Sequence, residues 1–298
     1  MRQDRREEIP AAFQPAFEII RPDRQTSAFV FSSPHSGRAY PEEFLQASRL
    51  DPRALRKSED CFVDLLFAGM PQHGAPLISA TFPRAYLDLN REPYELDPEL
   101  VAGPLPAHAN TQSIRVAGGL GTVARLVADG EEIYHERLSL KAVMARIEAL
   151  YFPFHTELSR LVEGTAGAFG YAVLVDCHSM PSSAAAGGGP RPDVVIGDRF
   201  GAACDSRLAR LAKEAFFKRG YDVQMNRPYA GGFITEHHGK PARGIHALQV
   251  EVNRGLYLDE RQFVLSSGFG CLQNDLNEVF QELMLAANHL LGYRAAAE

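Results

Sequence analysis

Two histidines, His35 and His178, each follow an apolar run and are each followed by a serine. The runs at 29–31 and 171–175 have the composition of buried β-strands. In an open α/β sheet, ligands and catalytic groups gather at the carboxyl ends of the strands. Imidazole is a common ligand of divalent metals, so two histidines at two strand ends predict a metal site, with zinc as the expected ion and another divalent metal as the alternative.

A catalytic zinc usually takes three protein ligands and keeps one position open for water. A carboxylate should therefore complete the set, and we favour Asp60, with Asp64 and Glu59 as alternatives. On the helix that we predict over 53–69, Asp60 and Asp64 would share one face. Acids at the start of a helix also serve as caps, so each of them has a structural explanation as well.

Two polar residues stand close to His178 in the sequence. Asp176 precedes it by two residues and Ser179 follows it directly. Carboxylates that hydrogen-bond to a metal-bound imidazole fix its orientation. We expect Asp176 and Ser179 to support His178 in this way.

A segment at 81–92 carries two arginines and an asparagine, Arg84, Asn90 and Arg91. These could be surface residues that pair with acidic neighbours. The alternative is a carboxylate-binding site, because the guanidinium fork matches a carboxylate in two places and asparagine adds a neutral donor.

Glu251 lies inside an otherwise apolar run at 246–252. A charge in a buried strand is costly unless it is paired or has a function. Glu251 is therefore either the partner of an arginine or a catalytic carboxylate, and beside a metal site it would serve as a general base.

Composition limits the classes of protein to consider. The chain has 298 residues, 45% of them hydrophobic, and a formal net charge of −6. This balance argues against nucleic acid as a partner, and no stretch is long and apolar enough to predict a membrane span. The charged start of the chain, without an apolar run after it, predicts a cytoplasmic protein rather than a secreted one. Four widely spaced cysteines are expected to be reduced and mostly buried thiols: Cys61, Cys177, Cys204 and Cys271.

Strand-like and helix-like runs alternate along the chain, which is typical of a sheet covered by helices on both faces. The predicted strands are 28–32, 75–80, 171–176, 193–196, 222–224 and 246–252. The predicted helices are 53–69, 136–163, 204–219 and 262–291. Two stretches, 92–121 and 182–192, are predicted to be irregular. We therefore predict a single α/β domain over residues 1–298.

Several motifs occur in an order that resembles the N-formylglutamate amidohydrolase family. They are Ser-Pro-His-Ser-Gly at 33–37, Asp-Leu-Asn-Arg at 88–91, Asp-Cys-His-Ser at 176–179, Gly-Gly-Phe-Ile-Thr at 231–235 and Ala-Leu-Gln-Val-Glu at 247–251. The order of functional elements is also similar to that of zinc carboxypeptidases and the aspartoacylase group. The resemblance covers about residues 29–257, most of the chain.

The resemblance implies a zinc carboxypeptidase-like (phosphorylase/hydrolase-like) fold with a mixed, mostly parallel sheet flanked by helices. It also implies zinc-dependent cleavage of the formyl amide of N-formyl-L-glutamate, a reaction of the histidine-degradation type on a small acidic N-acyl amino acid. In that interpretation His35 and His178 hold zinc together with an acid, and Glu251 moves the proton.

The same resemblance assigns roles to the arginine segment. Arg84 would stabilise the tetrahedral oxyanion, while Asn90 and Arg91 would hold a substrate carboxylate. Further candidates for a second carboxylate are Arg125, Arg243 and Arg254. Three tyrosines could lend a hydroxyl to the site: Tyr134, Tyr229 and Tyr257.

The sequence departs from related patterns at two places. The third residue after His35 is Arg38, so the His-x-x-Glu pattern of metallocarboxypeptidases does not supply the acidic ligand. At 235–239 the chain has Glu236 where we expect an arginine, and an acid there could weaken binding of a dicarboxylate.

Two alternatives to a deformylase stay open. One is a zinc-dependent deacylase or carboxypeptidase-like enzyme that acts on another N-acyl amino acid. The other belongs to a different class, a non-catalytic module that binds acidic ligands and lacks the metal.

Overall fold

The computed structural model describes residues 9–127, 130–183 and 192–292. Its main sheet has seven strands in the order β1-β3-β2-β6-β9-β7-β8. These strands are β1 (Phe17–Ile20), β2 (Phe29–Ser33), β3 (Leu77–Ala80), β6 (Ala172–Met180), β7 (Val194–Gly197), β8 (Val223–Met225) and β9 (Ile245–Asn253). Two small pairs complete the strands: β4 (Val101–Ala102) with β5 (Leu138–Ser139), and β10 (Leu258–Asp259) with β11 (Val264–Leu265).

Nine α-helices are found among the described residues. They are α1 (Glu42–Ala47), α2 (Pro52–Leu55), α3 (Val63–Leu66), α4 (Ile114–Ala117), α5 (Leu140–Arg146), α6 (Phe152–Phe169), α7 (Ser206–Phe217), α8 (Phe233–His238) and α9 (Phe269–Leu291).

The described residues divide into two compact units. The first unit comprises 9–18, 34–59 and 79–157, and the second comprises 19–33, 60–78 and 158–292. The single domain over residues 1–298 stays a prediction.

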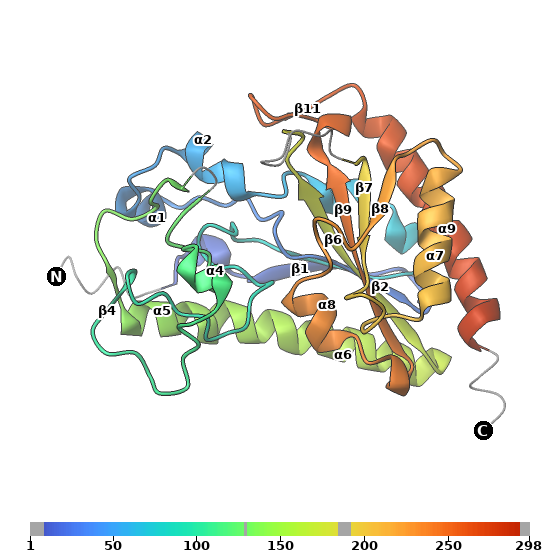
Figure 1. Cartoon of the computed structure of the whole chain (residues 1–298), viewed down its shortest axis with the longest axis horizontal. Helices are drawn as coiled ribbons and strands as arrows, with labels where there is room; N and C mark the ends of the chain where they lie inside the picture. The colour runs from blue at the N-terminus through green and yellow to red at the C-terminus, as the bar shows by residue number, and fades with distance from the viewer. Residues whose placement is uncertain (1–8, 128–129, 184–191, 293–298) are drawn as a thin grey trace. The chain divides into compact units, whose positions relative to one another are not determined.

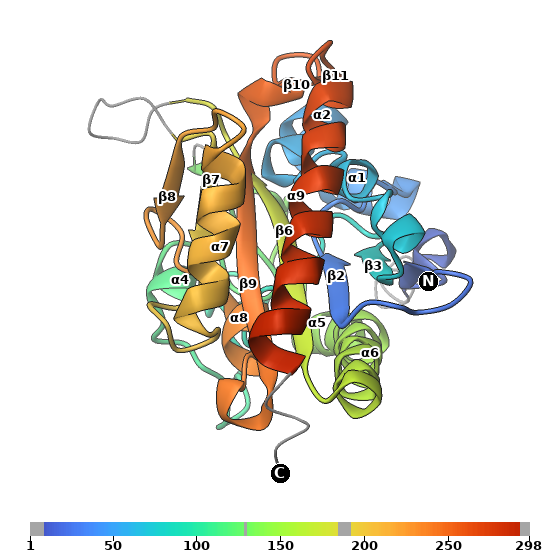
Figure 2. The same cartoon turned by 90° about the vertical axis from the view of Figure 1, so that its right-hand side faces the viewer.

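The second unit is built on the central strands of the sheet. Strand β6 pairs in parallel with both β2 and β9, β7 runs antiparallel to β9, and β8 is parallel to β7. Helices α7 and α9 lie side by side over one face of these strands (Figure 2), and α8 lies on the other face against β6 and β9 (Figure 1). The predicted α/β class, with a mixed, mostly parallel sheet flanked by helices, is confirmed.

The alternation of side chains along β6 separates its structural face from its polar face. Every residue of β6 is buried. Val173, Val175 and Cys177 belong to the hydrophobic core that includes α7 and α9. Because successive side chains of a strand point to opposite faces, Asp176 and His178 leave the sheet on the other side. The sheet therefore presents these polar groups away from the α7 and α9 core.

The predicted strands agree with the structure to within a few residues, but β1 and the two-residue strands β4, β5, β10 and β11 were not predicted. Of the predicted helices, 204–219 corresponds to α7, and 136–163 corresponds to α5 and α6 with a π-helical turn at Ile147–Tyr151 between them. The prediction of helix over 262–291 is correct only from Phe269, because β11 occupies its first turn.

The prediction of one helix over 53–69 is wrong. The segment contains α2, a 3₁₀ turn at Arg56–Ser58 and α3, with Glu59 extended and Phe62 in the left-handed region at φ 61°. The buried carbonyl of Cys61 accepts a hydrogen bond from the Tyr257 hydroxyl (2.9 Å), so tertiary bonds override helix propensity here. Asp60 and Asp64 consequently do not share a helix face.

Three further expectations concern irregular segments, thiols and membranes. The stretch at 92–121 is irregular apart from β4 and α4, and most of 182–192 lies outside the described residues. All four cysteines are free thiols, three of them buried. Within the part of the chain that the structure describes, no helix has the length and apolar character needed to cross a membrane.

Candidate active site

In the second unit, His178 has an aspartate against each ring nitrogen. Its Nε2 lies 2.8 Å from Asp176 Oδ2, and its Nδ1 lies 3.0 Å from Asp60 Oδ2. All three side chains are buried. Burial by itself lowers the pKa of His178, but Asp176 and the hydrogen bond to Asp60 outweigh it, so this pKa lies well above its ordinary value. The two carboxylates thus favour a positive charge on the imidazole ring or beside it.

Asp60 is held by two further buried groups. Its Oδ1 accepts hydrogen bonds from Arg254 Nη2 (3.1 Å) and Ser179 Oγ (3.3 Å). Arg254 Nε also donates to Ser179 Oγ at 3.0 Å. Burial lowers the pKa of Arg254, but the charge of Asp60 outweighs burial and raises it, so the guanidinium stays charged. Arg254, which we expect to bind substrate, contacts Asp60.

Glu251 is the register partner of His178 in the parallel pair of β6 and β9. Its side chain leaves the sheet opposite the neighbouring core residues Val250 and Val252. Gln249 Nε2 donates to Glu251 Oε1 at 2.8 Å, and Gln249 Oε1 accepts from the Gly232 amide at 2.7 Å. The Gly232 bond fixes which end of the Gln249 amide faces the carboxylate.

Sequence reasoning did not assign a role to Gln249. The available signal was its position two residues before Glu251, which places both side chains on the same face of a strand. A buried amide beside a buried carboxylate is a typical hydrogen-bond partner.

In the first unit, Asp88 is the centre of a buried polar cluster. Its carboxylate lies 2.8 Å from His35 Nε2 and accepts hydrogen bonds from Arg84 Nε (2.9 Å) and from the backbone N–H of Asn90 (2.8 Å). Arg91 Nη2 lies 3.3 Å from the same carboxylate. Burial raises the pKa of Asp88, but the neighbouring cations outweigh burial and hold this pKa well below its ordinary value. Sequence reasoning named Asp88 only as part of a motif.

The two arginines of this cluster differ in exposure. The side chain of Arg91 is 10% exposed, and it also donates to the carbonyls of Asn90 (2.9 Å) and Leu120 (2.8 Å). The side chain of Arg84 is 28% exposed. Burial lowers the pKa of Arg91 to about 10. Because its side chain is more exposed than that of Arg91, Arg84 has more surface available for a ligand.

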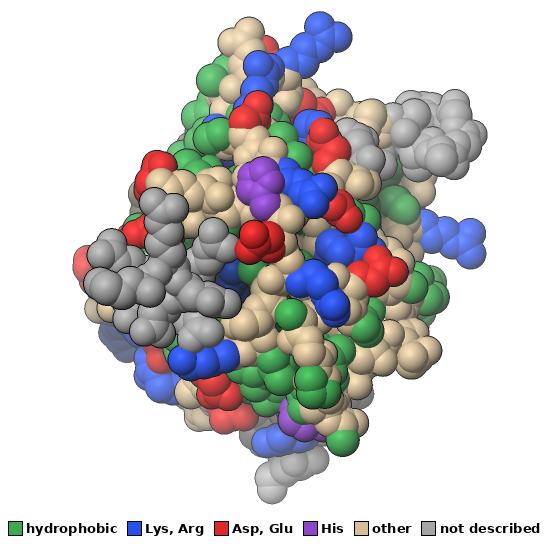
Figure 3. Space-filling view, turned by 90° about the vertical axis from the view of Figure 1, so that its left-hand side faces the viewer, with side chains coloured by type: hydrophobic (Ala, Val, Ile, Leu, Met, Phe, Trp, Pro, Cys, Tyr) green, Lys and Arg blue, Asp and Glu red, His purple; other side chains and the backbone are tan. Residues whose placement is uncertain are grey.

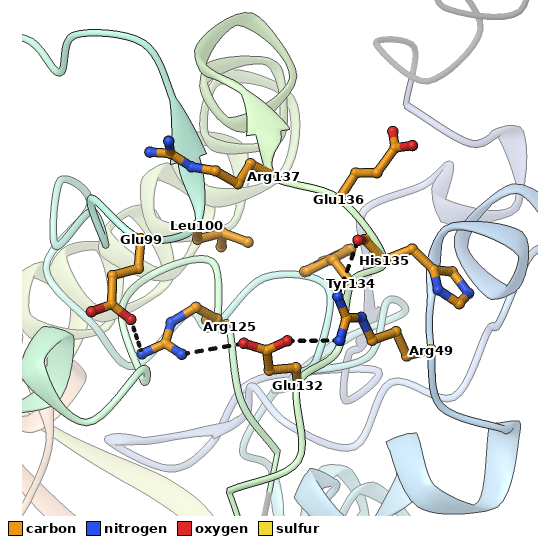
Figure 4. Close-up of a pocket in the computed structure, with 9 residues that line it drawn as sticks. All are labelled: Arg49, Glu99, Leu100, Arg125, Glu132, Tyr134, His135, Glu136 and Arg137. Carbon is orange, nitrogen blue, oxygen red and sulfur yellow. Dashed lines mark hydrogen bonds and ion pairs between the residues drawn. The ribbon is translucent and has the colours of Figure 1, made fainter.

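Arg125 lies in a different part of the first unit. It pairs with Asp97 and Glu99, both at 2.8 Å, and lines a pocket together with Arg49 and Glu132 (Figure 4). The carboxylate of Glu132 lies between the two arginines. On the face shown in Figure 3, basic and acidic side chains are interspersed. Arg125 is thus placed in an ion-pair network rather than with Asp88.

The remaining acidic candidates have partners of their own. Glu59 accepts from the Tyr40 hydroxyl (2.5 Å) and from Arg56 (3.1 Å). Asp64 lies in the first turn of α3. Glu236, in the segment that departs from the family pattern, pairs with Arg199 at 2.7 Å.

Among the tyrosine candidates, Tyr257 lies beside Ser179, Asp60 and Arg254 in the second unit. Tyr134 accepts a hydrogen bond from Arg146, and Tyr257 donates to the Cys61 carbonyl. Arg243 ends a 3₁₀ turn, Pro241–Arg243. Tyr229 lies between β8 and α8.

Comparison with known proteins identifies the family. The model of the N-formylglutamate amidohydrolase family matches residues 27–258. The chain belongs to this family. The resemblance expected from the sequence motifs is confirmed, and the match contains the segments that carry His35, Asp88, His178 and Glu251.

Relatives in this family support the assignment. The chain is 30% identical over 237 residues to an N-formylglutamate deformylase of Pseudomonas putida, covering 78% of this chain and 82% of that protein. It is 28% identical over 248 residues to an N-formylglutamate deformylase of Pseudomonas aeruginosa, and the match covers 82% of this chain and 87% of that protein. A crystal structure of the N-formylglutamate amidohydrolase from Ralstonia eutropha JMP134 is 33% identical with a TM-score of 0.83, covering 91% of this chain and 97% of the other.

Proposed function

We propose that this protein hydrolyses N-formyl-L-glutamate to L-glutamate and formate. The observation that carries the proposal is the family match over residues 27–258, supported by relatives named N-formylglutamate deformylase. The substrate class is a small acidic N-acyl amino acid. Four free cysteines fit a reducing compartment, so we include a cytoplasmic location in the proposal. A role in histidine degradation is included because the family resemblance implies a reaction of that type.

The proposed metal ligands are His35, Asp60 and His178. Each of these three side chains is buried. Two imidazoles and one carboxylate are a donor set that suits zinc and leaves a position open. Asp60 lies against His178 Nδ1, and His35 follows β2, the strand that pairs with β6, by two residues.

The surroundings of the two histidines support this donor set. His35 Nε2 contacts Asp88, and His178 Nε2 contacts Asp176, both at 2.8 Å. Metal-bound histidines usually give their second nitrogen to a carboxylate in this way, which fixes the tautomer. In both histidines Nε2 contacts an aspartate, so Nδ1 is the proposed ligand atom of each.

Proton transfer is assigned to Glu251. When bound, zinc supplies a water of lowered pKa and polarises the formyl carbonyl. Glu251 takes a proton from the attacking water and delivers it to the departing amine nitrogen as the C–N bond breaks. Gln249 holds the carboxylate in place. The products are formate and the free amino group of glutamate.

The arginine segment is assigned to charge stabilisation and binding. Arg84, with its more exposed side chain, donates to the oxyanion that forms on the formyl oxygen. Asn90 and Arg91 hold a substrate carboxylate. Arg254 and Arg125 remain predicted substrate-binding residues. Asp60 and Asp97 pair with them, as Asp88 pairs with Arg84 and Arg91.

The proposal is tested by measuring formate and glutamate released from N-formyl-L-glutamate by the zinc-loaded protein. N-acetyl-L-glutamate, N-succinyl-L-glutamate and a dipeptide serve as comparison substrates, because a larger acyl group must find room in the same site. We expect the formyl substrate to give the highest kcat/KM. Preference for another acyl group would favour the deacylase alternative, and ligand binding without any turnover would favour a binding module.

A further inference from the structure

Three buried side chains of one helical stretch contact backbone carbonyls of a single segment. Arg146 Nη1 donates to the Tyr86 carbonyl at 3.0 Å, and the Tyr151 hydroxyl donates to the Arg91 carbonyl at 2.6 Å. His155 Nε2 lies 2.9 Å from the carbonyl of Leu89. A carbonyl can only accept, so Nε2 is the protonated nitrogen of His155. All six residues belong to the first unit.

These bonds supply hydrogen-bond donors to the buried backbone carbonyls of the segment at 86–91. It is buried along its whole length and forms neither helix nor strand. Buried carbonyls need hydrogen-bond donors, and a segment without regular structure must obtain them from elsewhere. The helix supplies donors to three of these carbonyls, and Arg91 supplies the Asn90 carbonyl from within the segment.

The π-helical turn at Ile147–Tyr151 explains how the donors align. In a continuous α-helix, residues five apart are rotated by about 140° from one another, so Arg146 and Tyr151 would face different directions. A π-helical turn spaces its hydrogen bonds at i to i+5, which brings residues five apart onto one face. His155 follows Tyr151 at the ordinary α-helical spacing of four, and their rings lie 4.2 Å apart.

Two of the donors, Arg146 and Tyr151, are held in their protonated forms. The Arg146 guanidinium lies 3.8 Å from the centroid of the Tyr86 ring and also donates to the Tyr134 hydroxyl at 2.7 Å. Burial, followed by the charge of Asp88, raises the pKa of Tyr151 above its ordinary value. The hydroxyl therefore stays protonated at neutral pH and donates to the Arg91 carbonyl.

We propose that Arg146, Tyr151 and His155 are positioning residues that fix the backbone of the segment at 86–91. Through that backbone they set the direction of the Asp88 and Arg91 side chains. This inference rests on the proposed function, because Arg91 is assigned there to a substrate carboxylate. It adds residues that touch neither substrate nor metal but determine how the substrate is bound.

The first test is Tyr151→Phe, which removes only the hydroxyl. Tyr171→Phe is the matched control, because Tyr171 also loses a hydroxyl that donates to a side chain, Asn288, at 2.6 Å outside this segment. We expect Tyr151→Phe to raise KM for N-formyl-L-glutamate roughly fivefold with kcat changed less, the size expected for one lost hydrogen bond. Tyr171→Phe should leave KM unchanged even where it lowers Tm.

Amide hydrogen exchange supplies a readout that does not depend on activity. Peptides covering 84–92 should exchange faster in Tyr151→Phe than in the wild type or in Tyr171→Phe, while peptides from α7 exchange alike in all three proteins. Unchanged exchange at 84–92 would overturn the positioning role. A wild type that releases no formate would instead overturn the proposed function, and the exchange comparison would still decide this inference.

A second pair of variants separates the donor from the bulk of the side chain. His155→Gln keeps an N–H near the position of Nε2, whereas His155→Met has a similar size and no donor. We expect the Gln variant to keep a KM near that of the wild type and the Met variant to raise it. Equal KM values and equal exchange at 84–92 in the two variants would show that His155 only fills space.

Discussion

His178 and Glu251 are register partners on the parallel strands β6 and β9, and both side chains leave the sheet on the face opposite the α7 and α9 core. This relationship brings a candidate metal ligand and a candidate base together on the rigid centre of the sheet. Asp60 contacts His178 from a segment 118 residues away in the chain. The second unit thus supplies two proposed ligands and the base.

Replacing Glu251 by glutamine tests the base. The variant keeps the size of the side chain but cannot accept a proton from water, so we expect kcat to fall by about 10²- to 10⁴-fold. Zinc content, measured by mass spectrometry, should stay at the wild-type level because Glu251 is not a proposed ligand. A kcat close to that of the wild type would remove Glu251 from the chemistry.

Asp88→Asn tests the buried cluster through the free energy of unfolding. Removing one partner leaves the buried Arg91 charge uncompensated, so we expect a loss of about 3–5 kcal/mol at pH 7. The pKa of Asp88 is held well below its ordinary value, so its stabilising contribution is present above pH of about 4, the pKa of an unfolded aspartate. The contribution is lost as the pH falls through the lower pKa of the folded state.

Urea unfolding of the metal-free wild type and Asp88→Asn at several pH values provides the measurement. The difference in stability should be largest near neutral pH and shrink in acid. A difference of the same size at pH 7 and in strong acid would contradict the assigned ionisation of Asp88.

Arg254→Met tests whether Arg254 supports Asp60. The change removes the guanidinium that donates to Asp60 and Ser179 but keeps an apolar side chain of similar length. Loss of a residue that orients a ligand usually weakens metal binding by about 10- to 100-fold, and we expect a decrease of that size in chelator competition. Arg243→Met is the control, and equal zinc affinity in the two variants would argue against this role.

The identity of the acidic ligand is tested by three substitutions. Asp60→Asn should lose most of its zinc affinity, because a neutral amide is a much poorer zinc ligand than a carboxylate. Asp64→Asn and Glu59→Gln should bind zinc as the wild type does in isothermal titration calorimetry. Loss of binding in either of the latter, with Asp60→Asn unaffected, would transfer the ligand role to that residue.

The sequence predicted the sheet well because its strands are short, apolar and bounded by glycine and polar residues. It also located His178 and Glu251, since a charged residue inside an apolar strand stands out by pattern alone. The helix predicted over 53–69 failed because the bond from Tyr257 to the Cys61 carbonyl arises only in the folded chain. Local propensity carries no information about such a distant partner.

The same limit applies to the polar partners of the site. Arg254 is a predicted substrate-binding residue by type, but the sequence did not indicate that its guanidinium contacts Asp60, 194 residues away. Asp88 lay within a recognised motif, but its role as the centre of a cluster depends on how the segment at 84–91 turns back on itself. The donors Arg146, Tyr151 and His155 depend on a π-helical turn that no periodicity in the sequence indicated.

The most direct test of the account is a zinc titration of the chelated protein, followed by formate release from N-formyl-L-glutamate. We predict negligible formate release from the metal-free protein and a linear return of activity that ends at one zinc per chain. Full activity in protein shown to be free of metal would contradict the proposed site.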